Sequence, residues 1–78
     1  MNLYLISQTV NQDYDTYDSA VVCAESELDA RLIHPDGPGE RFEWEYMWAP
    51  VDKVEVKFLG TADPSVEAGV VLASFNAG

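Results

Sequence analysis

The alternation of hydrophobic and polar residues predicts a domain built mainly from short strands. Where large apolar side chains recur at every second position, the chain has the period of a strand with one buried face. Segment 41–48 follows this pattern most strictly, with acidic residues and a methionine between its aromatic residues. Segment 20–25 is apolar on both faces, which favours a central place in a sheet. Strands are expected at 2–10, 20–25, 41–48, 52–60 and 70–75.

The same alternation assigns side chains to the two faces of each strand. In segment 2–10, one face carries Leu3 and Leu5, and the other carries Tyr4, Ile6 and Val10. In segment 52–60, the residues expected to point inward are Val54, Val56 and Phe58. In segment 41–48, the residues that share one face are Phe42, Trp44, Tyr46 and Trp48. Four aromatic residues on one face are typical either of a core or of a contact surface.

One short helix is expected between the second and third strands, within 26–34. Ser26 is a good N-cap, and Asp29 puts negative charge in the first turn. Pro35 ends the helix, with His34 in its last turn. So short a helix must pack on a sheet to be stable. The order ββαβββ predicts a single α+β domain over residues 1–78, with a mostly antiparallel sheet of four to five strands and the helix on one face.

The charge balance limits the classes of partner. Four Lys and Arg stand against 14 Asp and Glu, for a net charge of −10. Direct binding to nucleic acid or to an acidic membrane surface needs clustered positive charge, which this chain lacks. The balance is compatible with simple solubility, or with a basic partner.

Cysteine content and hydropathy indicate a cytoplasmic location. The single cysteine, Cys23, excludes an intrachain disulfide, and a secreted domain this small usually needs such cross-links. In an apolar strand, Cys23 is expected to be a small core residue rather than a nucleophile. The first residues do not have the pattern of a signal peptide, and no apolar run is long enough to span a bilayer.

The acidic run "DYDTYD" invites two readings as a reactive site, and both fail. Asp13 and Asp15 have the spacing of the aspartates in the DxDxT motif of haloacid-dehalogenase-like phosphatases, but that motif needs a much longer chain and further catalytic residues. A calcium loop starting at Asp13 would need glycine at its sixth position, which is Asp18, and glutamate at its twelfth, which is Ala24. We therefore expect that this protein is not an enzyme and that it has no catalytic residues, no cofactor and no bound metal.

A contact surface is the remaining interpretation of these residues. Carboxylates two residues apart on an extended strand lie about 6.5 Å apart, a spacing at which they can stand in for phosphates. Aromatic side chains beside them can serve as anchors, since Trp and Tyr are frequent in binding hot spots. The residues expected to contact a partner are Asp13, Tyr14, Asp15, Tyr17, Asp18, Glu40, Glu43, Trp44 and Glu45.

Two stretches carry a resemblance to a known group of proteins. "YDTYDSAVVCAESELDARLIHPDG" and "GVVLASFNAG" resemble a family of very small acidic proteins encoded in phage and prophage genomes, mostly without assigned function. The resemblance supplies no catalytic residues. It implies a protein that acts in the host cell, since small phage proteins of this type are often inhibitors of host defence, such as anti-CRISPR proteins.

Together these features favour a non-catalytic phage protein that inhibits a host defence complex. Its expected partner is a basic protein or ribonucleoprotein, such as a Cas-type effector, whose nucleic-acid site the acidic surface would block. One alternative is a binder of a small ligand such as a nucleotide signal, with aromatic residues stacking on the base. Another is an accessory protein that forms a homodimer through an exposed strand edge.

Overall fold

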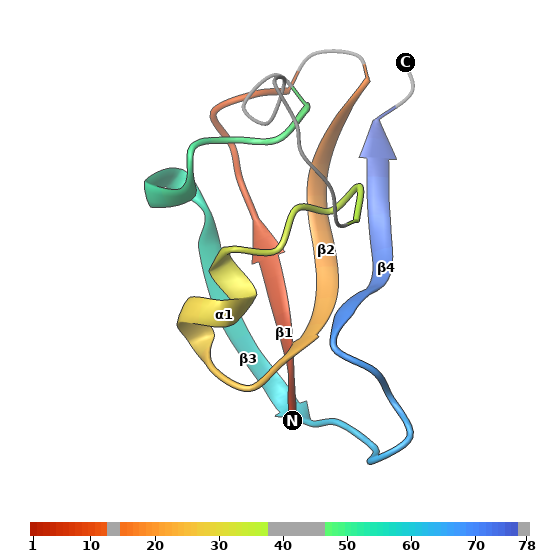
Figure 1. Cartoon of the computed structure of the whole chain (residues 1–78). Coiled ribbons are helices and arrows are strands. Elements are labelled where there is room, and N and C mark those ends of the chain that lie inside the picture. Colours follow the sequence, from red (N-terminus) through yellow and green to blue (C-terminus); the bar gives the residue numbers. More distant parts are fainter. Residues whose placement is uncertain (13–14, 38–46, 77–78) are drawn as a thin grey trace.

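Four strands form one open antiparallel sheet in the computed structural model, which describes residues 1–12, 15–37 and 47–76 (Figure 1). The strands are β1 (Asn2–Ser7), β2 (Thr16–Ala24), β3 (Glu55–Thr61) and β4 (Gly69–Asn76), in the spatial order β3-β1-β2-β4. A short helix, α1 (Glu27–Arg31), lies on one face, and a 3-10 turn, η1 (Val51–Lys53), precedes β3. The α+β class and the antiparallel sheet are as the sequence predicts.

The two central strands bring the most apolar parts of the sequence together. β1 and β2 pair from Asn2 opposite Ala24 to Ser7 opposite Ser19. This register places Tyr4 and Ile6 beside Val22 and Ala20 on the face that α1 covers, and all four are buried. The central place predicted for segment 20–25 is confirmed, although β2 begins earlier, at Thr16. Cys23 is buried, as expected.

The helix begins as predicted but ends sooner. The Ser26 hydroxyl accepts a hydrogen bond from the backbone N–H of Asp29 at 3.1 Å, which is the expected N-cap. The last helical residue is Arg31, so the placement of His34 in the final turn was wrong. Only Ala30 is buried within α1, and Ile33 packs against the core just beyond it. The helix therefore contributes a single buried side chain to the core.

β3 departs from the alternation that its sequence predicts. Val54 is buried and Val56 packs on the core, as expected, but Phe58 is 59% exposed. The register of β3 against β1 shifts between Leu3 and Tyr4, so that Leu59 has no partner opposite it. Phe58 lies opposite Tyr4, on the same face as Val56, with the ring centroids of Phe58 and Tyr4 5.8 Å apart. The predicted face is therefore confirmed, but Phe58 is exposed because β3 is an edge strand.

Trp48 is the largest fully buried side chain among the described residues. Segment 41–48 was predicted to be a strand, but Met47 and Trp48 belong to no strand, and residues 41–46 lie outside the described part. Trp48 packs in a core that otherwise contains many small side chains, such as Ala20, Ala24 and Ala30. Its indole N–H has no hydrogen-bond partner among the described residues.

β4 is an edge strand that the helix does not cover. α1 packs against β1, β2 and β3, and Figure 1 shows it on the β3 side of the sheet, away from β4. Val70 and Ala73 still contact the core, whereas Val71, Leu72 and Phe75 are exposed. The apolar character of segment 70–75 on both faces therefore leads to exposure rather than burial. In the described ranges, no helix has the length and hydropathy needed to cross a membrane.

Candidate protein-binding surface

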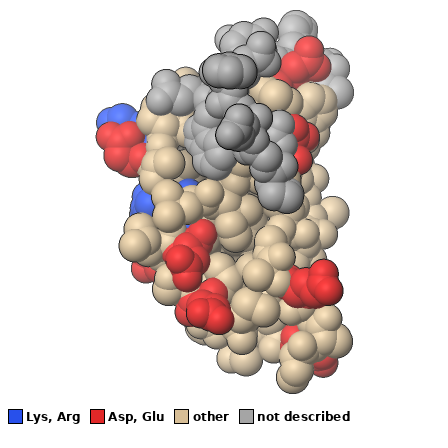
Figure 2. Space-filling model, in the orientation of Figure 1, with Lys and Arg blue, Asp and Glu red and all other residues tan. Residues whose placement is uncertain are grey.

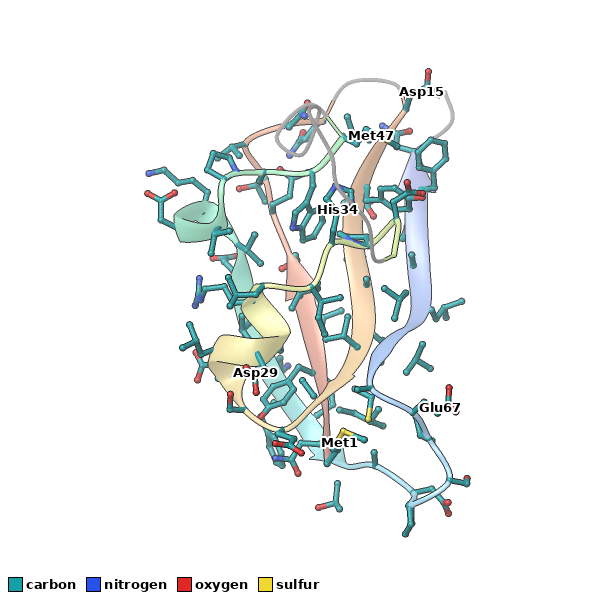
Figure 3. The ribbon with its side chains drawn as sticks, in the orientation of Figure 1. Met1, Asp15, Asp29, His34, Met47 and Glu67 are labelled. Carbon is teal, nitrogen blue, oxygen red and sulfur yellow. The ribbon has the colours of Figure 1, made fainter. Side chains whose placement is uncertain are left out.

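The structure describes three of the nine residues predicted to contact a partner, and it places them together. Asp15, Tyr17 and Asp18 lie at the start of β2, beside the end of β4. Figure 3 labels Asp15 at this end of the sheet. The residues of the prediction that lie outside the described part are Asp13, Tyr14, Glu40, Glu43, Trp44 and Glu45.

Asp15 has a left-handed backbone, with φ of 60°. Aspartate tolerates this conformation better than most residues. The turn lets the N–H of Asp15 donate to the carbonyl oxygen of Asn76 at 2.7 Å, which ties the start of β2 to the end of β4. The carboxylate stays exposed. Asp13 lies outside the described residues, so the spacing of the Asp13–Asp15 carboxylates stays a prediction.

A β-bulge presents Asp18. Tyr17 pairs with Phe75 and Ser19 pairs with Ser74, so Asp18 is the extra residue on β2. A bulge of this kind turns the side chains on its two sides and sharpens the local twist. The Asp18 carboxylate is exposed, and its carbonyl oxygen accepts a hydrogen bond from the N–H of Gln8 at 3.2 Å.

Tyr17 packs inward rather than standing free as an anchor. Its ring lies 4.8 Å from that of Phe75 and 6.3 Å from that of His34, measured between centroids. Its hydroxyl donates to Oδ1 of Asp36 at 2.7 Å. Phe75, which is 43% exposed, is the aromatic residue that offers more of its surface here. Neither Asp36 nor Phe75 was predicted as part of the surface.

The turn "HPDG" places Asp36 opposite Tyr17. The N–H of Gly37 donates to the carbonyl oxygen of His34 at 2.9 Å, and Gly37 adopts φ of 97°, which favours glycine. Proline at the second position and glycine at the fourth are typical of such a turn. His34 is 2% exposed, and its Nδ1 accepts from the N–H of Asp36 at 3.0 Å. The sequence therefore indicates that Asp36 lies in a turn, but it does not show that Asp36 contacts Tyr17 of β2.

Gln8 anchors the segment that follows β1. Its buried side chain donates to the carbonyl oxygens of Asn11 at 2.6 Å and Tyr17 at 2.8 Å, and it accepts from the N–H of Asn11 at 2.8 Å. The amide of Asn11 also reaches the carbonyl oxygen of Trp48 at 3.3 Å. This network fixes the backbone beneath Tyr17 and Asp18, so the surface sits on a rigid base.

We call the surface formed by Asp15, Tyr17, Asp18, Asp36 and Phe75 the acidic end. The exposed carboxylates of the described chain are not confined to it: all ten are exposed. Of the described cations, Arg31 lies 3.8 Å from Glu27 and donates to the carbonyl oxygens of Val51 and Val54. In Figure 2 the visible Lys and Arg atoms lie on the side of α1 and η1, whereas visible carboxylates extend to the side of β4.

Depressions in the described part of the molecule include two whose linings contain no Lys or Arg. One, of about 410 Å³, lies at the α1 end of the sheet and is lined by Met1, Cys23, Ala24, Glu25, Asp29, Ile33, Ala68 and Gly69. The other, of about 250 Å³, lies on the face opposite α1 and includes Leu5, Val21 and Leu72. Within the described ranges, no group of three or more His, Cys, Asp or Glu is arranged to hold a metal ion.

Comparison of the chain with protein-family models, with curated proteins and with solved structures finds no match.

Proposed function

We propose that this protein is a non-catalytic binding protein whose acidic end receives a basic surface of another protein. The observation that supports this proposal most strongly is the gathering of Asp15, Asp18 and Asp36 around Tyr17 and Phe75. Three separate backbone features place these residues near the start of β2 and the end of β4: the left-handed conformation of Asp15, the bulge at Asp18 and the "HPDG" turn, whose Asp36 bonds Tyr17.

Electrostatic attraction is the expected source of specificity. Exposed carboxylates beside an apolar ring match a surface of Lys and Arg around an apolar contact, and such complementarity accelerates association. The net charge of −10 extends the attraction beyond the contact itself. The alternative of a nucleotide ligand receives no support from the two described depressions, because neither is lined by a Lys or Arg side chain that could pair with a phosphate.

The narrower proposal concerns the biological partner. The resemblance to small phage proteins supports a host defence complex as the target, in the host cytoplasm. A Cas-type effector has a basic nucleic-acid channel of the kind that an acidic surface would occupy. In this proposal the protein inhibits by blocking that channel rather than by any reaction.

The experiment that tests the proposal is capture from a bacterial host lysate with the immobilised protein. Retained proteins are eluted with NaCl between about 0.1 and 0.5 M, which shortens the reach of charge interactions, and identified by mass spectrometry. We expect a basic nucleic-acid-binding protein that elutes in this range and that competes with its own nucleic acid. Retention of only acidic or neutral proteins, or binding that salt does not weaken, would contradict the proposal.

A further inference from the structure

The outer edge of β4, which pairs with no strand among the described residues, is the second feature of the molecule suited to binding a partner. β4 is the last strand of the order β3-β1-β2-β4, and no described strand pairs with its outer edge. Its eight residues include no charged residue and no proline. Proteins usually protect such edges with lysine, proline, short length or bulges, because unpaired N–H and C=O groups bind other strands.

The opposite edge of the sheet, formed by β3, has two of the features that protect an edge from pairing with another strand. β3 carries Glu55 and Lys57, and its register against β1 shifts near Leu59. β4 has a single extra residue of its own, Val71, between the pairs Val22–Val70 and Val21–Leu72. Beyond this bulge the strand continues through Leu72 to Phe75 without an insertion. That part of β4 can accept another strand.

Apolar side chains flank this edge on both faces of the sheet. Leu72 is 70% exposed on the face opposite α1, where it lines a depression with Leu5 and Val21. Phe75 lies on the other face, against Tyr17. Because successive side chains of a strand point to opposite faces, an added strand with apolar residues at consecutive positions would find an apolar neighbour on each face.

The charges around β4 indicate what kind of strand fits. Asp15, Asp18 and Asp36 lie at its C-terminal end, and Asp63 and Glu67 precede its N-terminal end. All five carboxylates are exposed. A second copy paired antiparallel to β4 would bring the acidic end of one molecule to Asp63 and Glu67 of the other. A strand with Lys or Arg at its ends would instead be attracted at both.

We propose that the edge of β4 from Leu72 to Phe75 binds an extended segment of a basic partner protein by strand addition. Main-chain hydrogen bonds to β4 give affinity, and the apolar neighbours on the two faces select a segment that is apolar on both of its faces. The flanking carboxylates select Lys or Arg at the ends of the segment. This inference rests on the proposed function, because it assigns the same basic partner a second, backbone-mediated contact.

The test uses labelled synthetic peptides of about nine residues, within the usual range of strand lengths, with a central run of Val and Ile flanked by Lys. Binding is followed by fluorescence anisotropy and by the NMR shifts of the protein amides. We expect the Lys-flanked peptide to bind with shifts concentrated at residues 72–75. Peptides with flanking Glu, or with proline at the centre, should bind at least tenfold more weakly.

Leu72→Lys is the variant that probes the edge, because it adds a protective lysine at an exposed position. Leu59→Lys is the matched control on the β3 edge. We expect Leu72→Lys to weaken peptide binding at least tenfold and Leu59→Lys to leave it within about twofold. Equal effects of the two variants, no binding of the Lys-flanked peptide at about 1 mM, or amide shifts confined to β3 or α1 would overturn the inference.

Further outcomes distinguish the proposed contact at the β4 edge from the proposed role of the acidic end. If Asp15→Asn with Asp18→Asn weakens peptide binding while Leu72→Lys does not, the acidic end stands and the edge contact is wrong. If neither variant changes binding, both proposals fail. A wild-type protein that is dimeric by light scattering, and monomeric as Leu72→Lys, would show that a second copy occupies the edge, which also overturns the inference.

Discussion

At the scale of single residues, the acidic end depends on a few polar contacts that link distant parts of the chain. The hydroxyl of Tyr17 reaches Asp36, the N–H of Asp15 reaches Asn76, and the side chain of Gln8 holds the backbone of Tyr17. Local sequence predicts turns and caps well, so Ser26 and the "HPDG" turn were foreseeable. It does not show which residues meet across the sheet, and for that reason Asp36 and Phe75 were missed.

Removing the hydroxyl of Tyr17 should loosen the position of Asp36. Tyr17→Phe keeps the ring contacts with His34 and Phe75 and deletes the hydrogen bond to the carboxylate. Because this bond is exposed, we expect a loss of about 1 kcal/mol in the free energy of unfolding. Urea denaturation measures the loss, and Tyr4→Phe, whose hydroxyl accepts a bond from Asn2 at 3.3 Å, is a control for removing a hydroxyl elsewhere. Equal losses in the two variants would show that the Asp36 contact has no special weight.

The pH dependence of the Asp63 turn is a second prediction at this scale. The N–H and the hydroxyl of Ser65 donate to the Asp63 carboxylate at 2.9 and 2.7 Å, which lowers its pKa below the ordinary value of 3.8. Since the folded-state pKa is depressed, this contribution to stability is present above pH 3.8 and is lost as the pH falls through the folded value.

Ser65→Ala should therefore raise the pKa of Asp63 toward its ordinary value. The carboxyl resonance of Asp63, followed by NMR during an acid titration, reports the change. We expect the wild-type protein to be more stable than the variant near neutral pH and the difference to vanish in acid. An unchanged titration of Asp63 in Ser65→Ala would show that the hydrogen bond from the Ser65 hydroxyl does not contribute to the lowered pKa.

At the scale of elements, periodicity predicts which segments form strands better than it predicts how much of each is buried. β1, β2, β3 and β4 lie within or close to the expected segments, and the central position of β2 follows from its apolar character. Phe58 lies on the predicted face but is exposed because β3 is an edge strand, and a strand's place in the sheet depends on its neighbours. The exposure of β4 likewise depends on the position of another element, because α1 packs against β1, β2 and β3 and does not cover β4.

Trp48 should account for a large share of the stability of this small core. Its side chain is fully buried among alanines and valines, so Trp48→Ala leaves a void and should cost about 3–5 kcal/mol in the free energy of unfolding. Trp48→Phe keeps a ring and removes an indole N–H that has no partner among the described residues, so its cost should be about 1–3 kcal/mol.

Chemical denaturation measures the free energy of unfolding of both variants. If Trp48→Ala does not fold, Trp48→Phe alone tests the prediction. Leu28→Ala is the control on exposed apolar surface, with an expected change below about 0.5 kcal/mol. If Trp48→Phe were no more costly than Leu28→Ala, the place of Trp48 at the centre of the core would be contradicted.

At the scale of the whole molecule, the net charge follows directly from the sequence, whereas the distribution of the charges over the surface depends on the fold. Composition alone gives the value of −10, and the fold leaves every described carboxylate exposed. The fold also distributes the charges unevenly over the molecule, which composition cannot show. The visible cations lie on the side of α1 and η1 (Figure 2). The strand β4 itself has no charged residue and lies between acidic groups at its two ends. A basic partner is therefore expected to approach from the β4 side.

The measurement that decides between an interaction surface and mere solubility is the salt dependence of binding to the captured partner. Asp15→Asn with Asp18→Asn neutralises the acidic end, and Asp52→Asn with Glu55→Gln removes the same two charges at η1 and β3. We expect the first variant to bind about tenfold more weakly than wild type, with a shallower dependence of log Kd on log NaCl concentration, and the second to stay within about twofold. Identical curves for the two variants would show that the acidic end makes no contact of its own.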